Sequence, residues 1–149
     1  MEIVLVEPEI PQNTGSVARL CAATRSRLHL VGRLGFSLED RYLKRAGLDY
    51  WPHVDLRVHA DWPSFLASRA PSRLFAFSSH GAESYTRIAF RDDDALVFGG
   101  ESKGLPAALR DELAPLWRIP IETGAVRSLN LANAVSIVLY EGLRQLGRA

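Results

Sequence analysis

The sequence predicts an α/β fold with a mostly parallel sheet flanked by helices. The first observation is that continuous apolar runs such as 3–6 and 95–98 are typical of strands buried on both faces. The second is that strands and helical patterns alternate at the spacing of parallel βαβ units. The 149 residues, 47% of them hydrophobic, suffice for one domain with its own core. We therefore expect a single domain over residues 1–149.

The first half of the chain alternates between apolar runs and helical patterns. These predict strands at 3–6, 28–31 and 54–58, and helices at about 15–24, 36–51 and 61–68. Asn13 or Thr14 can cap the first helix. In the second helix Ser37 is the expected cap, Asp40 has capping-box spacing and Gly47 closes the helix.

The second half predicts three more strands and two more helices. The strands lie at 73–77, 95–98 and 117–121, and the helices at about 105–113 and 128–145, with a polar loop at 78–84 and an acidic turn at 92–94. The last helix is apolar around most of its circumference, which predicts burial on more than one side. Its first turn is polar, and helix N-termini offer free N–H groups to ligands. We therefore expect its open end to face a site.

Composition excludes several classes of protein. No apolar run reaches transmembrane length, and the N-terminus lacks a signal-peptide pattern. The single cysteine, Cys21, lies in an apolar helical pattern, which favours a packing role and a reducing compartment. The four histidines, at positions 29, 53, 59 and 80, do not have metal-ligand spacing. We expect a cytoplasmic protein without a metal centre or a membrane partner.

Positive charge is concentrated in one segment. The net charge of the chain is only +1, yet seven basic and two acidic residues lie between Arg19 and Arg45. Such a segment indicates a local contact with an anion. A solvated face of scattered arginines explains the same pattern, so charge alone leaves both interpretations open.

Three loops carry unusual chemistry where ligands bind in parallel sheets, beyond the carboxyl ends of the strands. They are 8–15, 99–104 and 122–130. In the first, Asn13 and Arg19 near a positive helix end suit a phosphate or a polarised hydroxyl, and Gly15 permits close backbone approach. A helix cap and a surface arginine are the alternative.

The other two loops suggest a pocket for a flat ring. Gly99 and Gly100 follow a buried strand, where glycine is costly unless backbone must approach something. Glu101 next to them holds a ligand or caps a helix, and the loop matches neither a dinucleotide nor a nucleoside-triphosphate fingerprint. In the third loop Ser128 and Asn130 orient a hydroxyl or cap the final helix, while the apolar side chains nearby form a slot, namely Ile119, Ile121 and Leu129.

Together and in this order, the three motifs resemble the SPOUT superfamily of S-adenosylmethionine-dependent RNA methyltransferases, and within it the ribose 2′-O-methyltransferases. The motifs are Asn13-x-Gly15-x-x-x-Arg19, Gly99-Gly100-Glu101-x-x-Gly104-Leu105, and Ser128-Leu129-Asn130 before an apolar helix. Segments 7–11 and 45–51, and the size of the chain, are similar to the small tRNA wobble-position (nucleotide 34) cytidine/uridine 2′-O-methyltransferases.

The resemblance implies a fold, a reaction and partners. The fold includes a C-terminal trefoil knot over about 73–149, and the assembly is a homodimer. The reaction moves a methyl group from S-adenosyl-L-methionine to the ribose 2′-hydroxyl of nucleotide 34, in the anticodon stem-loop of tRNA. Three alternatives stay open: a 2′-O-methyltransferase acting on another RNA site, a non-catalytic RNA-binding factor with the same fold, and a small α/β enzyme acting on a nucleotide metabolite.

The resemblance also implies the site residues. The catalytic set is Asn13, Arg19, Glu101, Ser128 and Asn130. The cofactor contacts are Phe77, Gly99, Ile119 and Ser128, with Gly100, Gly104, Ile121 and Leu129 close by. For the RNA surface we expect four residues of the basic segment: Arg25, Arg41, Lys44 and Arg45. Because a guanidinium normally stays protonated, we expect Arg19 to bridge the target phosphate and polarise the hydroxyl rather than to act as a base.

Overall fold

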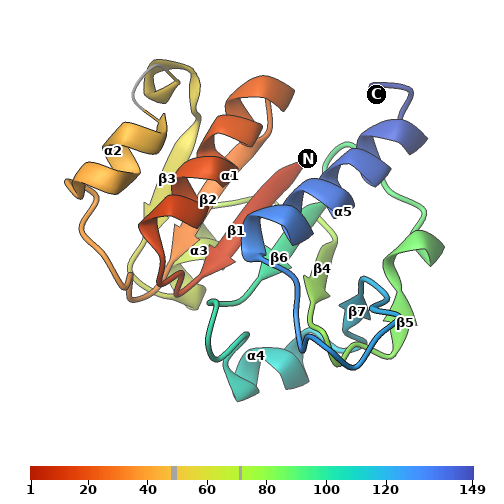
Figure 1. Ribbon diagram of the computed structural model, residues 1–149. Helices are drawn as coiled ribbons and strands as arrows, with labels where there is room; N and C mark the ends of the chain where they lie inside the picture. The colour runs from red at the N-terminus through yellow and green to blue at the C-terminus, as the bar shows by residue number, and fades with distance from the viewer. Residues whose placement is uncertain (48–49, 71) are drawn as a thin grey trace.

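A seven-stranded sheet forms the centre of the computed structural model, which describes residues 1–47, 50–70 and 72–149 (Figure 1). The strands are β1 (Glu2–Val6), β2 (Arg27–Val31), β3 (Leu56–His59), β4 (Leu74–Phe77), β5 (Glu83–Ser84), β6 (Ala95–Phe98) and β7 (Trp117–Arg118). Their order is β3-β2-β1-β6-β4-β7-β5, and every pairing between them is parallel. The predicted α/β fold with a mostly parallel sheet is confirmed.

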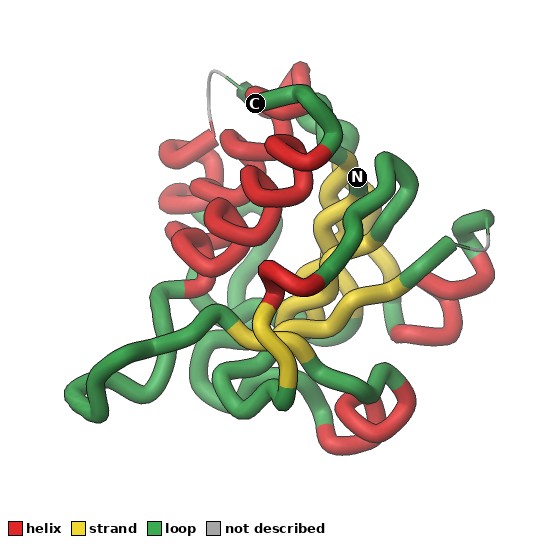
Figure 2. The backbone as a smooth tube through the Cα atoms, turned by 90° about the vertical axis from the view of Figure 1, so that its right-hand side faces the viewer, coloured by secondary structure: helices red, strands yellow, loops and turns green. Residues whose placement is uncertain are grey.

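Helices cover both faces of this sheet (Figures 1 and 2). They are α1 (Pro11–Thr24), α2 (Arg41–Gly47), α3 (Trp62–Ala67), α4 (Ala107–Glu112) and α5 (Leu131–Gln145), with short 3-10 helices η1 (Trp51–His53) and η2 (Tyr85–Arg87). Side chains of β1 alternate between the two faces, as a strand requires. Ile3 and Leu5 pack on the side of α1 and α5, whereas Val4 and Val6 pack on the side of α3 and α4. None of the described helices is long and apolar enough to cross a membrane.

The strand order has a switch point between β1 and β6. From β1 the chain proceeds to β2 and β3 on one side, and later strands are added on the other side, where β6 pairs directly with β1. In a parallel sheet such a switch point opens a crevice at the carboxyl ends of the strands. The loops that follow β1 and β6 therefore meet there.

Several predicted helix starts are wrong. Helix α1 begins at Pro11 rather than near residue 15, its N-cap is Ile10, and neither Asn13 nor Thr14 caps it. Helix α5 begins at Leu131 rather than at residue 128, and its cap is Asn130, whose side chain accepts from the backbone N–H of Asn133 at 3.2 Å. Capping of the final helix by Asn130 was one of the two predicted roles of that residue and is confirmed. The start of α1 differs because Glu101, from a distant loop, accepts from the backbone N–H groups just ahead of the helix.

The predicted helix over 36–51 is also wrong in its extent. Only Arg41–Gly47 is α-helical in the described part of this segment, and it starts after Asp40, whose carboxylate accepts from Tyr42 N at 2.7 Å. Ser37 instead accepts from Glu39 N within a turn. Positions 48 and 49, which belong to this prediction and to segment 45–51, lie outside the described residues.

The strand expected at 117–121 has only two paired residues, and the loop expected at 78–84 contains β5. The buried position of Cys21 is confirmed, and burial raises the pKa of its thiol to about 12.

Candidate active site

A cleft of about 710 Å³ opens at the carboxyl ends of β1, β4, β6 and β7. Its walls are the loops that follow these strands and the first turn of α5. All eight residues predicted to contact the cofactor line it: Phe77, Gly99, Gly100, Gly104, Ile119, Ile121, Ser128 and Leu129. Four of the five predicted catalytic residues line it too, namely Asn13, Glu101, Ser128 and Asn130. The structure thus brings together loops that lie far apart in the sequence.

The glycine loop after β6 is closed on itself. Gly104 donates its N–H to the carbonyl of Gly100 at 2.9 Å, with Gly104 at a positive φ of 66°. A Cβ atom on Gly99 would lie 2.1 Å from the carbonyl carbon of Gly104. Glycine is required at both positions, for the close approach and for the backbone conformation. The result is a tight turn that presents backbone to the cleft.

Glu101 binds the start of α1. Its carboxylate accepts from the backbone N–H of Glu9 at 2.7 Å, from that of Ile10 at 3.1 Å, and from Asn13 Nδ2 at 3.1 Å. It thereby satisfies donors ahead of a helix that has no side-chain cap of its own. The prediction allowed a ligand or the following helix as the partner of Glu101. The structure shows a third partner, the N-terminus of α1.

Asn13 connects this carboxylate to the third loop. Its Nδ2 donates to Glu101, and its Oδ1 accepts from Asn130 Nδ2 at 2.9 Å. Because one end donates and the other accepts, the orientation of the Asn13 amide is fixed. Asn130 is fixed in turn, since its Oδ1 caps α5. A hydrogen-bonded chain Glu101–Asn13–Asn130 therefore links the three loops that were predicted to form the site.

A second bond between the first two loops was missed by the sequence analysis. Glu9 accepts from both the backbone N–H of Ser102 at 3.0 Å and its hydroxyl at 2.7 Å. These hydrogen bonds lower the pKa of the Glu9 carboxyl, so the contact persists at neutral pH. The only hint in the sequence is that Glu9 lies in segment 7–11.

Apolar side chains form the rest of the wall. Phe77 and Phe98 stack with their ring centroids 4.9 Å apart, and both border the cleft with Ile119, Ile121 and Leu129. Apolar walls with a few fixed polar groups are usual for a cofactor pocket. The slot suits an adenine ring, and the closed glycine loop offers backbone groups beside it. These residues therefore fit S-adenosylmethionine.

Arg19 is the predicted catalytic residue that does not line the cleft. It is exposed on α1, and its guanidinium lies over the ring of Tyr50, 4.6 Å from the centroid. Arg19 lies six positions after Asn13, which places it about 9 Å farther along the helix and on another face.

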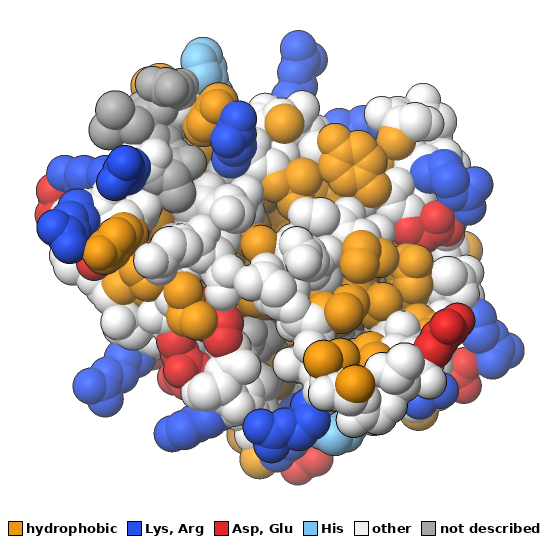
Figure 3. Space-filling view, viewed as in Figure 1, with side chains coloured by type: hydrophobic (Ala, Val, Ile, Leu, Met, Phe, Trp, Pro, Cys, Tyr) orange, Lys and Arg blue, Asp and Glu red, His pale blue; other side chains and the backbone are white. Residues whose placement is uncertain are grey.

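The four residues expected to bind RNA are all exposed. Arg25 follows α1 at its C-cap, at the opposite end of the helix from the cleft. Arg41, Lys44 and Arg45 belong to α2, which packs beside α1, and Figure 3 shows basic side chains over this region at the left. Arg41 lies over the Tyr42 ring, and Lys44 is paired with Glu39.

Seven polar residues that the prediction omitted also line the cleft: Ser78, Ser79, His80, Ser102, Lys103, Arg110 and Arg127. The first three belong to the loop after β4, where Gly81 was the available signal. A Cβ atom on Gly81 would lie 2.4 Å from the carbonyl carbon of Trp117, so glycine lets this loop wrap around β7.

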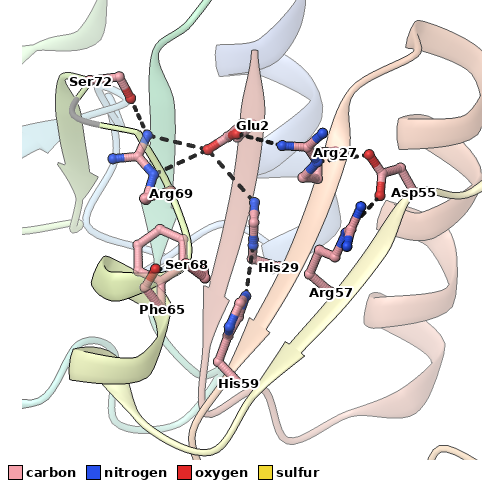
Figure 4. A network of polar contacts seen from close by, with 10 residues as sticks. All are labelled: Glu2, Arg27, His29, Asp55, Arg57, His59, Phe65, Ser68, Arg69 and Ser72. Carbon is pink, nitrogen blue, oxygen red and sulfur yellow. Dashed lines mark hydrogen bonds and ion pairs between the residues drawn. The ribbon is translucent and has the colours of Figure 1, made fainter.

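A separate polar network lies under α3, outside the cleft (Figure 4). His29 Nδ1 and His59 Nε2 are 2.9 Å apart, and Glu2 is 3.6 Å from His29 Nε2 and 3.2 Å from Arg69. The pKa of the Glu2 carboxyl is lowered to about 2, first by its polar contact with His29 and then by the positive charges of His29 and Arg69. Burial and the neighbouring charges of His29 and Arg57 lower the pKa of His59. Within the described ranges, no group of three or more His, Cys, Asp or Glu side chains could hold a metal ion.

The parallel fold and this cleft define the chain as a methyltransferase of the SPOUT class. Within that class, it belongs to the SpoU rRNA Methylase family, whose model matches residues 1–140.

Individual relatives match almost the whole chain. A tRNA (cytidine(34)-2′-O)-methyltransferase of Burkholderia pseudomallei (strain 1106a) is 50% identical, over 97% of this chain and 95% of the relative. A solved structure described as "Structural insights into the 2-OH methylation of C/U34 on tRNA" is 50% identical, with a TM-score of 0.94 over 99% of this chain and 97% of the other. An AdoMet-bound rRNA methyltransferase from Sinorhizobium meliloti is 28% identical, with a TM-score of 0.86 over 97% of this chain and 56% of the other.

Proposed function

We propose that this chain transfers a methyl group from S-adenosylmethionine to the ribose 2′-hydroxyl of the wobble nucleotide, position 34, of tRNA. The nucleotide is a cytidine or a modified uridine. The observation that carries the proposal is the chain Glu101–Asn13–Asn130, because it fixes the side-chain amides of Asn13 and Asn130 beside the cofactor slot. Whole-length similarity to tRNA (cytidine(34)-2′-O)-methyltransferases supports the same reaction.

The residues of the cleft align the reactants. Ile119, Ile121 and Leu129 would cover the faces of the adenine, and backbone groups of the glycine loop would bind its polar edge. Bound S-adenosylmethionine supplies a methyl group that its sulfonium has already activated. Ser128 and Asn130 orient the ribose hydroxyl in line with that group. Catalysis then consists mainly of alignment and proton removal, and alignment alone is worth several orders of magnitude.

Arg19 acts on the RNA from outside the cofactor slot. Its guanidinium stays protonated and binds a phosphate of the RNA next to the target nucleotide. Its exposed position on α1 leaves it accessible to RNA. Arg25, Arg41, Lys44 and Arg45 extend the same positive surface over α1 and α2, toward the rest of the anticodon stem-loop.

The active assembly is a homodimer that packs through α5. Ile137 is 36% exposed and Tyr140 is 48% exposed on this helix, and Figure 3 shows hydrophobic side chains gathered over it. Apolar patches of this kind mark protein interfaces. The predicted burial of α5 on more than one side then follows, with the sheet on one side and a second copy on the other.

The proposal also includes a single cytoplasmic domain over 1–149 and a trefoil knot over about 73–149. The position of β7 supports threading, because β7 lies between β4 and β5, which both precede it in the chain.

Methylation of total tRNA with labelled cofactor tests the function. After digestion, we expect the label on the ribose of nucleotide 34. A label on a base, or on a nucleotide outside the anticodon, would overturn the proposed substrate.

A further inference from the structure

A second, smaller pocket adjoins the cofactor cleft. Its volume is about 200 Å³, and it shares Ser79, Ile119, Ile121 and Arg127 with the cleft. Arg118, Pro120, Thr123 and Val126 complete its lining. The polar side chains of this lining are therefore two guanidinium groups, of Arg118 and Arg127, and two hydroxyl groups, of Ser79 and Thr123. We refer to this smaller pocket as the side pocket.

The positive charge of the side pocket is not neutralised within the described chain. None of the ion pairs among described residues involves Arg118 or Arg127. Glu83, on the strand next to Arg118, is instead bound to Arg87 at 2.7 Å. Glu122 belongs to the same loop as Thr123, but it does not line the pocket. Two free guanidinium groups at one pocket indicate an anionic ligand.

The side pocket rests on a rigid support. Arg118 belongs to β7, which pairs with β4 on one side and β5 on the other. The loop that carries Ser79 is fastened to the same strand, because Ser78 N donates to Trp117 O at 2.9 Å and Ala82 N donates to Leu116 O at 3.0 Å. The close approach of Gly81 to Trp117 brings this loop against β7. The backbone that carries Ser79 and Arg118 is therefore held in place before a ligand arrives.

We propose that the side pocket binds a backbone phosphate of the RNA, on a nucleotide next to the one that is methylated. The inference rests on the proposed function and adds a contact on the C-terminal loop to the basic segment on α1 and α2. Guanidinium and hydroxyl groups are common partners of phosphate oxygens. The shared wall places this phosphate beside the ribose that enters the cleft. Arg127 contributes to both cavities, so the test uses Arg118, which lines only the side pocket.

The test compares Arg118→Ala with Arg118→Lys and with the matched control Arg57→Ala. Arg57 is also exposed, but it lies on β3, at the opposite edge of the sheet. Binding of a fluorescent anticodon stem-loop RNA is measured over a salt series, S-adenosylmethionine binding by calorimetry, and folding by thermal melting. Arg118→Ala should weaken RNA binding about tenfold and reduce the slope of log K against log salt by about 1. Cofactor affinity should stay unchanged, and Arg118→Lys should recover part of the RNA affinity because it keeps the charge.

Two results would overturn the inference. If Arg118→Ala and Arg57→Ala bind RNA with equal affinity and slope, the side pocket holds no phosphate. If cofactor affinity falls while RNA binding does not, it holds the carboxylate of the cofactor instead. Methylation of nucleotide 34 by the wild-type protein is measured in parallel, so that a failure of this inference is distinguished from a failure of the proposed function. If Arg118→Ala does not fold, Arg118→Lys is used in its place. The inference is then also overturned if Arg118→Lys and Arg57→Ala have the same RNA affinity and the same slope of log K against log salt.

Discussion

Asn13 uses both ends of its side-chain amide, and neither end is available to act as an acid or a base. It donates to Glu101 at 3.1 Å and accepts from Asn130 at 2.9 Å. Its contribution is to hold Asn130 and the start of α5 in place relative to α1. Asn13 is thus a positioning residue, and so is Glu101, whose carboxylate is occupied by three donors.

Replacing Asn13 should separate turnover from cofactor binding. In Asn13→Ala the link between the first and third loops is lost, and misplacement by about 1 Å can reduce turnover about 100-fold. We expect this loss in kcat with the Kd for S-adenosylmethionine changed less than about threefold, because the apolar slot stays intact. Gln12→Ala, an exposed neighbour, is the control. Unchanged turnover in Asn13→Ala would contradict the positioning role.

Arg19 should be essential for turnover yet dispensable for the cofactor. It does not line the cleft, so Arg19→Ala should abolish methyl transfer while calorimetry gives a nearly unchanged cofactor affinity. Arg19→Lys keeps the charge but not the bidentate geometry, so it should recover only a small part of the activity. An equal loss of cofactor binding in Arg19→Ala would place its side chain in the cofactor pocket instead.

Among the elements, the strands were predicted better than the helices. The run 95–98 matches β6 in both bounds, because a strand buried on both faces is a continuous apolar segment. The start of α1 was misplaced because the N–H groups just ahead of the helix, those of Glu9 and Ile10, are bound by Glu101, which is about ninety residues away in sequence. With this boundary moved, Arg19 lies more than two turns into α1 and not one, so its distance from the cleft could not be predicted.

The network that joins β1, β2 and α3 should limit stability in acid. The pKa of Glu2 is about 2 in the folded protein, against 4.5 for an ordinary glutamate, so its contribution is complete above pH 4.5 and is lost as pH falls toward 2. The expected contribution is about 2 kcal/mol, since a pKa shift of one unit is worth about 1.4 kcal/mol and partial exposure reduces the effect. Urea unfolding should give wild type a free energy of unfolding that exceeds that of Glu2→Gln by this contribution at pH 6. At pH 2 the two free energies of unfolding should be almost equal. A constant difference between these two pH values would exclude the assigned contacts as its cause.

The exposed face of α5 should control assembly. Ile137→Asp puts a charge into the proposed interface, where an unpaired charge is costly, so light scattering should show a monomer where the wild type is a dimer. Leu66→Asp is the matched control: Leu66 is 38% exposed on α3, on the other face of the sheet. If both variants keep the mass of the wild type, the interface does not include Ile137.

At the scale of the whole molecule, one rule predicted the site. Ligands of parallel sheets bind beyond the carboxyl ends of the strands, and the three chemically unusual loops were all assigned to those ends. The structure confirms that these loops meet: of the twelve distinct residues predicted for catalysis or cofactor binding, eleven line one cleft, and only Arg19 lies outside it. The side pocket was missed because Arg118 was counted as part of a strand. The role of the Arg118 charge in a pocket can be recognised only from the structure, which places β7 between β4 and β5.

The central claim is that one hydroxyl, the ribose 2′-hydroxyl of nucleotide 34, accepts the methyl group. The most direct test uses two synthetic anticodon stem-loops that differ only in this atom, one with a ribonucleotide and one with a 2′-deoxynucleotide at position 34. Mass spectrometry after incubation with S-adenosylmethionine should show the added mass of one methyl group on the ribonucleotide form and none on the deoxy form. Equal methylation of the two RNAs would contradict the account.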